Sequence, residues 1–110
     1  MRDLKTVYEG SNIQGSAHVS CIKYRNLQNI SHYHSDYELV YVNEGIAQVA
    51  VNDKKYELHA DECIFIHSND IHNIQNCLTY PFSPYTYVQM HYNNPKIHLY
   101  KQMHSYMLQH

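Results

Sequence analysis

The sequence predicts an all-β fold, a sandwich or barrel of antiparallel strands in a single domain. Short segments rich in aliphatic, β-branched and aromatic residues recur along the chain, and clusters of turn-forming residues separate them. A chain of 110 residues is long enough for one hydrophobic core but not for two. Charged residues make up 16% of the chain and the formal net charge is −2, which excludes a highly charged disordered segment.

The strongest strand pattern lies at 37–43, where β-forming aliphatic and aromatic residues dominate. Asn43-Glu44-Gly45 follows as a turn, and we expect it to join this strand to 46–51 in a hairpin. Further turn formers lie at 52–55 and 68–70, and two prolines mark 79–84 as a loop. The strand-type segments, in chain order, are 17–24, 37–43, 46–51, 56–58, 63–67, 71–74 and 85–92.

The last stretch of the chain has a helical pattern. Pro95 suits the first turn of a helix, and residues of one face then recur at helical spacing, at Ile97, Tyr100, Met103 or His104, and Met107. No stop signal follows before His110. We therefore expect a β-sandwich domain at 1–94 and the start of a linker or dimerisation helix at 95–110, cut from a longer protein.

Composition narrows the class of partner. The eight Lys and Arg residues are scattered, whereas a protein that grips DNA concentrates positive charge on the phosphates. No apolar leader and no apolar run of membrane-spanning length is present. Cys21, Cys63 and Cys77 lack metal-type spacing and indicate reduced thiols, with Cys63 expected in the core. These features predict a cytoplasmic protein that has no membrane partner and does not bind DNA through this stretch.

Three imidazoles and one carboxylate form the candidate site: His32, His34, Glu38 and His72. His32 and His34 share one face of a strand, but on a straight strand Glu38 would lie roughly 13 Å beyond His34. Ser35-Asp36 favours a bend that would return Glu38 to the histidines, and His72 must come from a neighbouring strand. These are ligands for Zn, Ni, Mn, Fe or Cu. They would equally suit the polar floor of a small-molecule pocket without metal.

Tyr24, Gln48 and Gln89 are further candidates for a ligand pocket. Sugar sites combine aromatic platforms with amide hydrogen bonds, although each of these residues also fits a purely structural role. In the strand at 85–92, Tyr85, Tyr87, Gln89 and His91 share one face. We expect the opposite face, with Thr86, Val88, Met90 and Tyr92, to be the core face, which leaves the first set for a pocket or solvent.

The candidate site resembles the first motif of the cupin superfamily, Gly-x5-His-x-His-x3–4-Glu-x6-Gly. His32, His34, Glu38 and Gly45 match it in residue and spacing, while Asn26 stands where the leading glycine would be. This resemblance implies a cupin-type antiparallel β-sandwich, or jelly-roll barrel, with the four candidate residues in its pocket.

The second cupin motif, Gly-x5-Pro-x-Gly-x2-His-x3-Asn, is matched at His72 and Asn76. Asp61, His67 and Asn69 replace its first glycine, its proline and its second glycine. Asparagine tolerates the left-handed backbone conformation for which glycine is used, and aspartate does so less well. We therefore expect the frame of the motif to survive these replacements.

One branch of that superfamily is more similar still. The string at 32–45, and the stretch from Cys63 through Asn69 to His72, resemble the N-terminal domain of AraC-type transcription regulators. This resemblance implies a domain that is not an enzyme, senses a small effector such as a sugar or related metabolite, and forms a homodimer. The helix-turn-helix motifs that bind DNA would lie beyond His110.

The alternative hypothesis is a free-standing small cupin metalloenzyme of dioxygenase or isomerase type. In that case the three histidines and Glu38 would hold one divalent ion, Zn, Ni, Mn or Fe, as Lewis acid or oxygen activator. A sugar-binding module without a regulatory partner would share the same fold.

Overall fold

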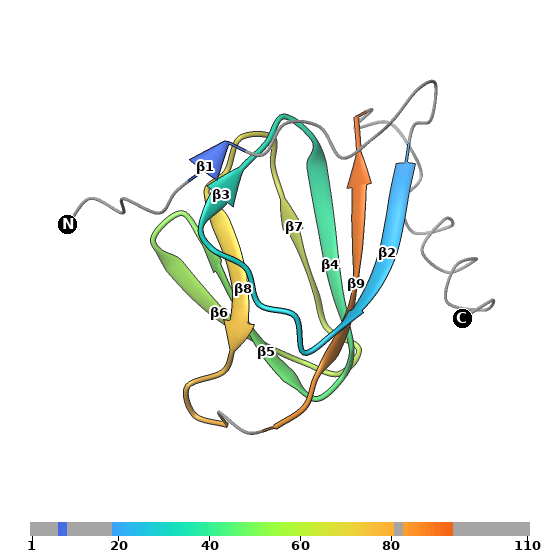
Figure 1. Cartoon of the computed structure of the whole chain (residues 1–110), viewed down its shortest axis with the longest axis vertical. Coiled ribbons are helices and arrows are strands. Elements are labelled where there is room, and N and C mark those ends of the chain that lie inside the picture. Colours follow the sequence, from blue (N-terminus) through green and yellow to red (C-terminus); the bar gives the residue numbers. More distant parts are fainter. Residues whose placement is uncertain (1–6, 9–18, 81–82, 94–110) are drawn as a thin grey trace.

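The computed structural model describes residues 7–8, 19–80 and 83–93. These residues form two β-sheets that face each other, as Figure 1 shows, which confirms the predicted all-β sandwich. The expected helix at 95–110 and the boundary after residue 94 lie outside the described residues. Within the described ranges, no helix is long and apolar enough to cross a membrane.

One sheet has five strands and the other has four. The five-stranded sheet has the order β1 (Val7–Tyr8), β3 (His32–Tyr33), β8 (His72–Asn76), β5 (Ile46–Val51) and β6 (Lys54–His59). The four-stranded sheet has the order β2 (Val19–Arg25), β9 (Thr86–Tyr92), β4 (Tyr37–Glu44) and β7 (Cys63–Ile66). Neighbouring strands are antiparallel, except that β1 runs parallel to β3.

The hairpin expected at Asn43-Glu44-Gly45 is wrong, because β4 and β5 belong to different sheets. The chain turns a corner there. Gly45 has a φ of +75°, and a Cβ at this position would collide with the carbonyl of Pro84, so the corner requires glycine. The next turn does form a hairpin, since β5 pairs with β6 from Ile46↔His59 to Val51↔Lys54.

Strand β9 is buried on both of its faces, which corrects the expectation that only one of them is core. Tyr85 and Tyr87 pack between the sheets with residues such as Val40 and Ile74. Val88 and Met90 pack with Leu39 on the other face of the four-stranded sheet. Side chains of the neighbouring strands β2 and β4, namely Cys21, Tyr37 and Tyr41, pack against this second cluster. Cys63, expected in the core, is exposed because β7 lies at the edge of this sheet.

Candidate metal centre and ligand pocket

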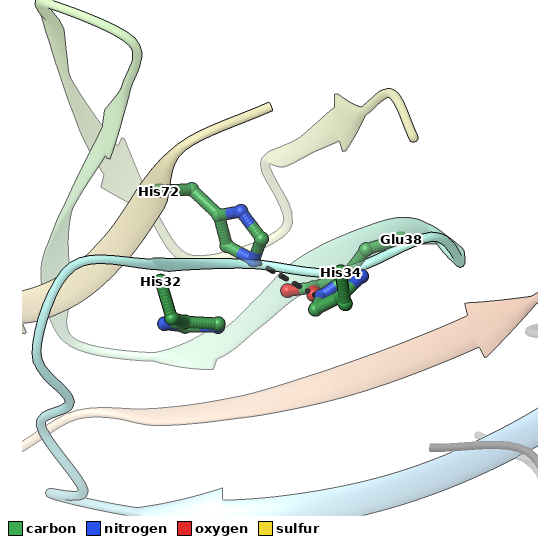
Figure 2. Close-up of side chains that lie close together, drawn as sticks. All are labelled: His32, His34, Glu38 and His72. Atoms are coloured by element: carbon green, nitrogen blue, oxygen red, sulfur yellow. Dashed lines mark hydrogen bonds and ion pairs between the residues drawn. The ribbon is translucent and has the colours of Figure 1, made fainter. Parts of the chain in front are cut away.

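The four predicted site residues come together between the sheets, and Figure 2 shows their side chains pointing toward one another. His32 lies in β3 and pairs in register with His72 of β8. The chain leaves the strand at His34, bends at Ser35–Asp36, and re-enters a strand at Tyr37, as the sequence predicted. One ligand atom of each residue lies within 4.8 Å of those of the other three, and all four side chains are buried.

Each of the three histidines is oriented by a backbone carbonyl two residues away. The bonds are His32 Nδ1 to the oxygen of Ile30 (2.8 Å), His34 Nδ1 to that of Asp36 (3.1 Å), and His72 Nδ1 to that of Asp70 (2.7 Å). A carbonyl only accepts hydrogen bonds, so Nδ1 carries the proton in each ring. A neutral imidazole has one proton, so the Nε2 atom of each ring is left with a lone pair, the form that binds a metal.

The carboxylate of Glu38 is the centre of the cluster. Its Oε1 lies 2.9 Å from His34 Nε2, 3.1 Å from His72 Nε2 and 2.8 Å from His91 Nε2. Its Oε2 accepts a hydrogen bond of 2.9 Å from the amide of Gln89. Complete burial raises the pKa of Glu38, but the contacts with the three histidines lower it by more, so the pKa lies well below its ordinary value.

A count of protons shows why this cluster suits a divalent metal. For Nε2 of His34 and His72 to donate to Glu38, both rings would need two protons and a positive charge, since Nδ1 is already a donor in each. Two buried imidazolium groups against one carboxylate would leave excess positive charge in a site closed to water. One divalent ion replaces the two Nε2 protons and leaves the rings neutral. The residues therefore fit a metal held by His32, His34, Glu38 and His72.

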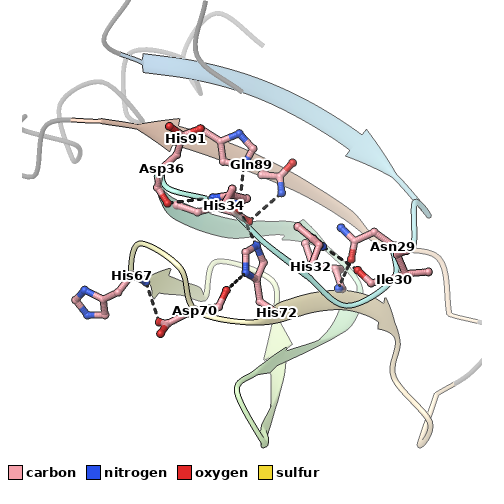
Figure 3. Close-up of polar contacts among 12 residues, drawn as sticks. Asn29, Ile30, His32, His34, Asp36, His67, Asp70, His72, Gln89 and His91 are labelled. Carbon is pink, nitrogen blue, oxygen red and sulfur yellow. Dashed lines mark hydrogen bonds and ion pairs between the residues drawn. The ribbon is translucent and has the colours of Figure 1, made fainter. Parts of the chain in front are cut away.

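Two of the contacts to Glu38 come from β9, and sequence reasoning found only one of these residues. Gln89 was predicted as a pocket residue; His91 was placed on the same face but not in the site. Figure 3 shows both projecting from β9 on the side of His34. His91 lies directly across from Glu38 in the β4–β9 register. The Gln-x-His alternation was visible in the sequence, but its partner strand was not.

A pocket of about 330 Å³ adjoins the cluster and is lined by Tyr24, His32 and Gln89, among other residues. Two of these three, His32 and Gln89, also belong to the polar cluster, so the pocket and the cluster are continuous. Gln48 is not brought to this site. Its neighbours Ala47 and Val49 face the interior, so alternation along β5 places Gln48 on the outer face of the five-stranded sheet, opposite Gln75.

Comparison with known proteins identifies the family. A protein-family model described as a cupin domain matches residues 20–82, which is more than half of the chain. The chain belongs to the cupin family. No curated protein shows significant sequence similarity to this cupin chain.

Several solved structures share the fold at low sequence identity. An RmlC-like cupin from Shewanella frigidimarina has a TM-score of 0.59 at 16% identity over 72% of this chain and 69% of its own. The protein TT1209 from Thermus thermophilus has a TM-score of 0.63 at 20% identity, over 74% and 79% of the two chains. The polyketide cyclase RemF from Streptomyces resistomycificus has a TM-score of 0.60 at 19% identity, over 73% and 58%.

The positions where this chain departs from the cupin glycines keep the backbone that glycine would adopt. Asn26, Asp61 and Asn69 have φ angles of 54°, 69° and 65°. This confirms the expectation that Asn69 and Asp61 preserve the second motif, and the same explanation covers Asn26 in the first. Asparagine and aspartate enter this region more readily than other residues with a side chain.

Proposed function

We propose that this cupin chain is the ligand-sensing domain of an AraC-type transcription regulator and that a small effector binds in the pocket beside Glu38. The continuity of pocket and polar cluster through His32 and Gln89 carries the proposal. A ligand in this pocket touches Gln89, which donates a hydrogen bond to Glu38, so occupancy is transmitted into the buried centre of the sandwich. The similarity of 32–45 to AraC-type regulators supports the regulatory assignment, because that string builds β3, the bend and β4.

The effector would act by shifting a conformational equilibrium. The segment between β2 and β3 borders the pocket and is bonded to both sheets: Asn26 N–H donates to the carbonyl of Tyr85, and Asn29 N–H to that of Ile74. A ligand that contacts this segment favours the arrangement in which both connections are made. In the proposed regulator, a cytoplasmic homodimer carries this change to DNA-binding motifs beyond the present chain.

A divalent metal would have a defined place in such a domain. His32, His34, Glu38 and His72 would hold it, and it would supply a Lewis-acidic point at the inner end of the pocket. The residues themselves orient the rings through Nδ1 and exclude water by their burial.

A second candidate function is a small cupin metalloenzyme. It is favoured by one observation: His32 is at once a member of the metal-type cluster and a wall of the pocket. A substrate in the pocket would therefore lie beside the metal. The structurally similar RemF is a polyketide cyclase, and such a reaction class is compatible with this arrangement.

Metal content and the chemical fate of a bound ligand distinguish the two functions. Metal content is measured on protein purified without added metal, for the wild type, His34→Ala and the exposed control His67→Ala. Small molecules that raise the melting temperature are then incubated with the metal-loaded chain and recovered. A sensor returns the ligand unchanged. Stoichiometric metal that is lost in His34→Ala alone, together with conversion of the ligand, would establish the enzyme and overturn the sensor.

The regulatory part of the proposal has its own test. The reading frame beyond residue 110 is expected to encode two helix-turn-helix motifs. A stop codon directly after this position would contradict the AraC-type assignment.

A further inference from the structure

The pocket beside the cluster is large enough for a small organic molecule. Its volume of about 330 Å³ lies at the lower end of the range for ligand sites. Strands β2 and β9 supply Tyr24, Tyr87 and Gln89, and the segment between β2 and β3 supplies Leu27, Asn29 and Ile30. The chemistry of these walls limits what can bind.

The described walls of the pocket carry no formal charge, since none of the lining residues is Lys, Arg, Asp or Glu. Glu38 is outside this set, and its two oxygens are already engaged by Gln89 and three histidines. A charged group in the body of the pocket would lose its water without gaining an opposite charge, which is costly. The part of a ligand that fills the pocket is therefore uncharged.

The polar capacity of the walls is small because most of it is used within the protein. Burial raises the pKa of Tyr87, and its hydroxyl donates to the carbonyl of Leu27 at 3.2 Å. Asn29 Oδ1 accepts from the N–H of Ile74, and Gln89 Nε2 donates to Glu38. Two amide atoms of these residues have no partner within the described part of the chain: Asn29 Nδ2, a donor, and Gln89 Oε1, an acceptor.

Among Asn29, Tyr87 and Gln89, one free donor and one free acceptor remain, which match a single hydroxyl or amide group on a ligand. A sugar brings four or five hydroxyls, and each that is buried without a partner costs roughly 1–3 kcal/mol. These walls therefore disfavour a polyhydroxylated molecule.

The rest of the lining is apolar or aromatic. The rings of Tyr24 and Tyr87 lie with centroids 5.5 Å apart, tilted by 39°. Val7, Leu27 and Ile30 are 48%, 45% and 54% exposed, so this pocket leaves apolar surface in contact with water. Aromatic and aliphatic walls bind a flat apolar ring by covering such surface.

We propose that the pocket takes a flat, uncharged and largely apolar molecule, of the class of an aromatic ring that bears one hydroxyl or amide group. This inference rests on the proposed function, since it names the ligand class of the same site. It also replaces the sugar that the resemblance to AraC-type regulators led us to expect.

The test compares four probes of similar size: benzamide, benzoate, benzylamine and glucose. Binding is followed by NMR on chelator-treated protein, so that a bound ion does not alter charge recognition. Benzamide is expected to bind at least ten-fold more tightly than each of the other three. The variant Leu27→Asp should weaken benzamide at least ten-fold and shift the preference toward benzylamine, a gain that misfolding does not produce. Leu78→Asp, a matched change at an exposed leucine outside the pocket lining, should alter neither.

Two results would overturn the inference in different ways. If glucose or benzoate binds best and Leu27→Asp still changes that binding, the ligand class is wrong but the pocket stands as the effector site. If none of the probes binds at millimolar concentration, the pocket does not take this class. The regulatory proposal would then be decided separately by the sequence beyond residue 110.

Discussion

The space between the two sheets has a polar end and an apolar end, and the same two strands build both. On β4, Glu38 faces inward at one end and Val40 and Val42 at the other. On β9, His91 and Gln89 meet Glu38, whereas Tyr87 joins the apolar core together with Tyr85, which directly precedes the strand. Stabilising residues and site residues therefore occupy different parts of the same strands. The apolar end supplies stability, and the polar end supplies a site.

The polar end is tolerated because its groups are paired. Burying a carboxylate and several imidazoles is unfavourable unless each polar atom has a partner. Glu38 meets four side chains, those of His34, His72, Gln89 and His91. Backbone carbonyl groups fix the rings of His32, His34 and His72. An end built in this way is ordered but contributes less net stability than the apolar end.

The largest effect on folding is expected from the apolar end. Ile74→Ala should lower the free energy of unfolding by about 2–5 kcal/mol, because Ile74 is fully buried between the sheets and truncation leaves a cavity. Chemical denaturation measures this, and Ile22→Ala at an exposed site provides the control. A loss below about 1 kcal/mol would contradict the contrast between the two ends, because the apolar end would then not be the main source of stability.

At the polar end, metal binding should respond more than folding does. His91→Leu removes a donor that holds Glu38 at 2.8 Å, and the affinity for Zn²⁺ should fall about 10–100-fold. His91→Gln keeps an N–H donor and should restore most of that affinity. Competition with a coloured chelator measures the dissociation constant. Equal affinity in wild type and His91→Leu would show that His91 does not position Glu38.

The smallest effect is expected in the loop that precedes β8. Asn69 has a φ of 65°, so Asn69→Ala should cost about 1–2 kcal/mol of unfolding free energy and Asn69→Gly almost nothing. Thermal or chemical unfolding of both variants tests this. The opposite order of stability would mean that the side chain of Asn69, not its backbone conformation, stabilises the loop.

Much of this structure could be predicted from local patterns. The strands, the bend at Ser35–Asp36 and the convergence of His32, His34, Glu38 and His72 depend on alternation and on a motif with fixed spacing. The roles of Gln48 and His91 depend on which face of which sheet a strand joins. Local sequence does not encode the choice of sheet and face, because the chain passes from one sheet to the other at Gly45, between β4 and β5. A one-residue change in register moves a side chain to the opposite face.

The segment between β2 and β3 is joined to the sheets partly through side-chain amides. Asn26 Oδ1 accepts from the N–H of Tyr85, Gln28 Oε1 from that of Asn76, and Asn29 Oδ1 from that of Ile74. Breaking these three bonds leaves the ladders of both sheets intact. Ligand exchange through this wall also needs release of the backbone bonds from Asn26 and Asn29 and of the tyrosine hydroxyls bonded to the carbonyl of Leu27. Its rate is therefore set by the opening of one short segment rather than by unfolding of the sandwich.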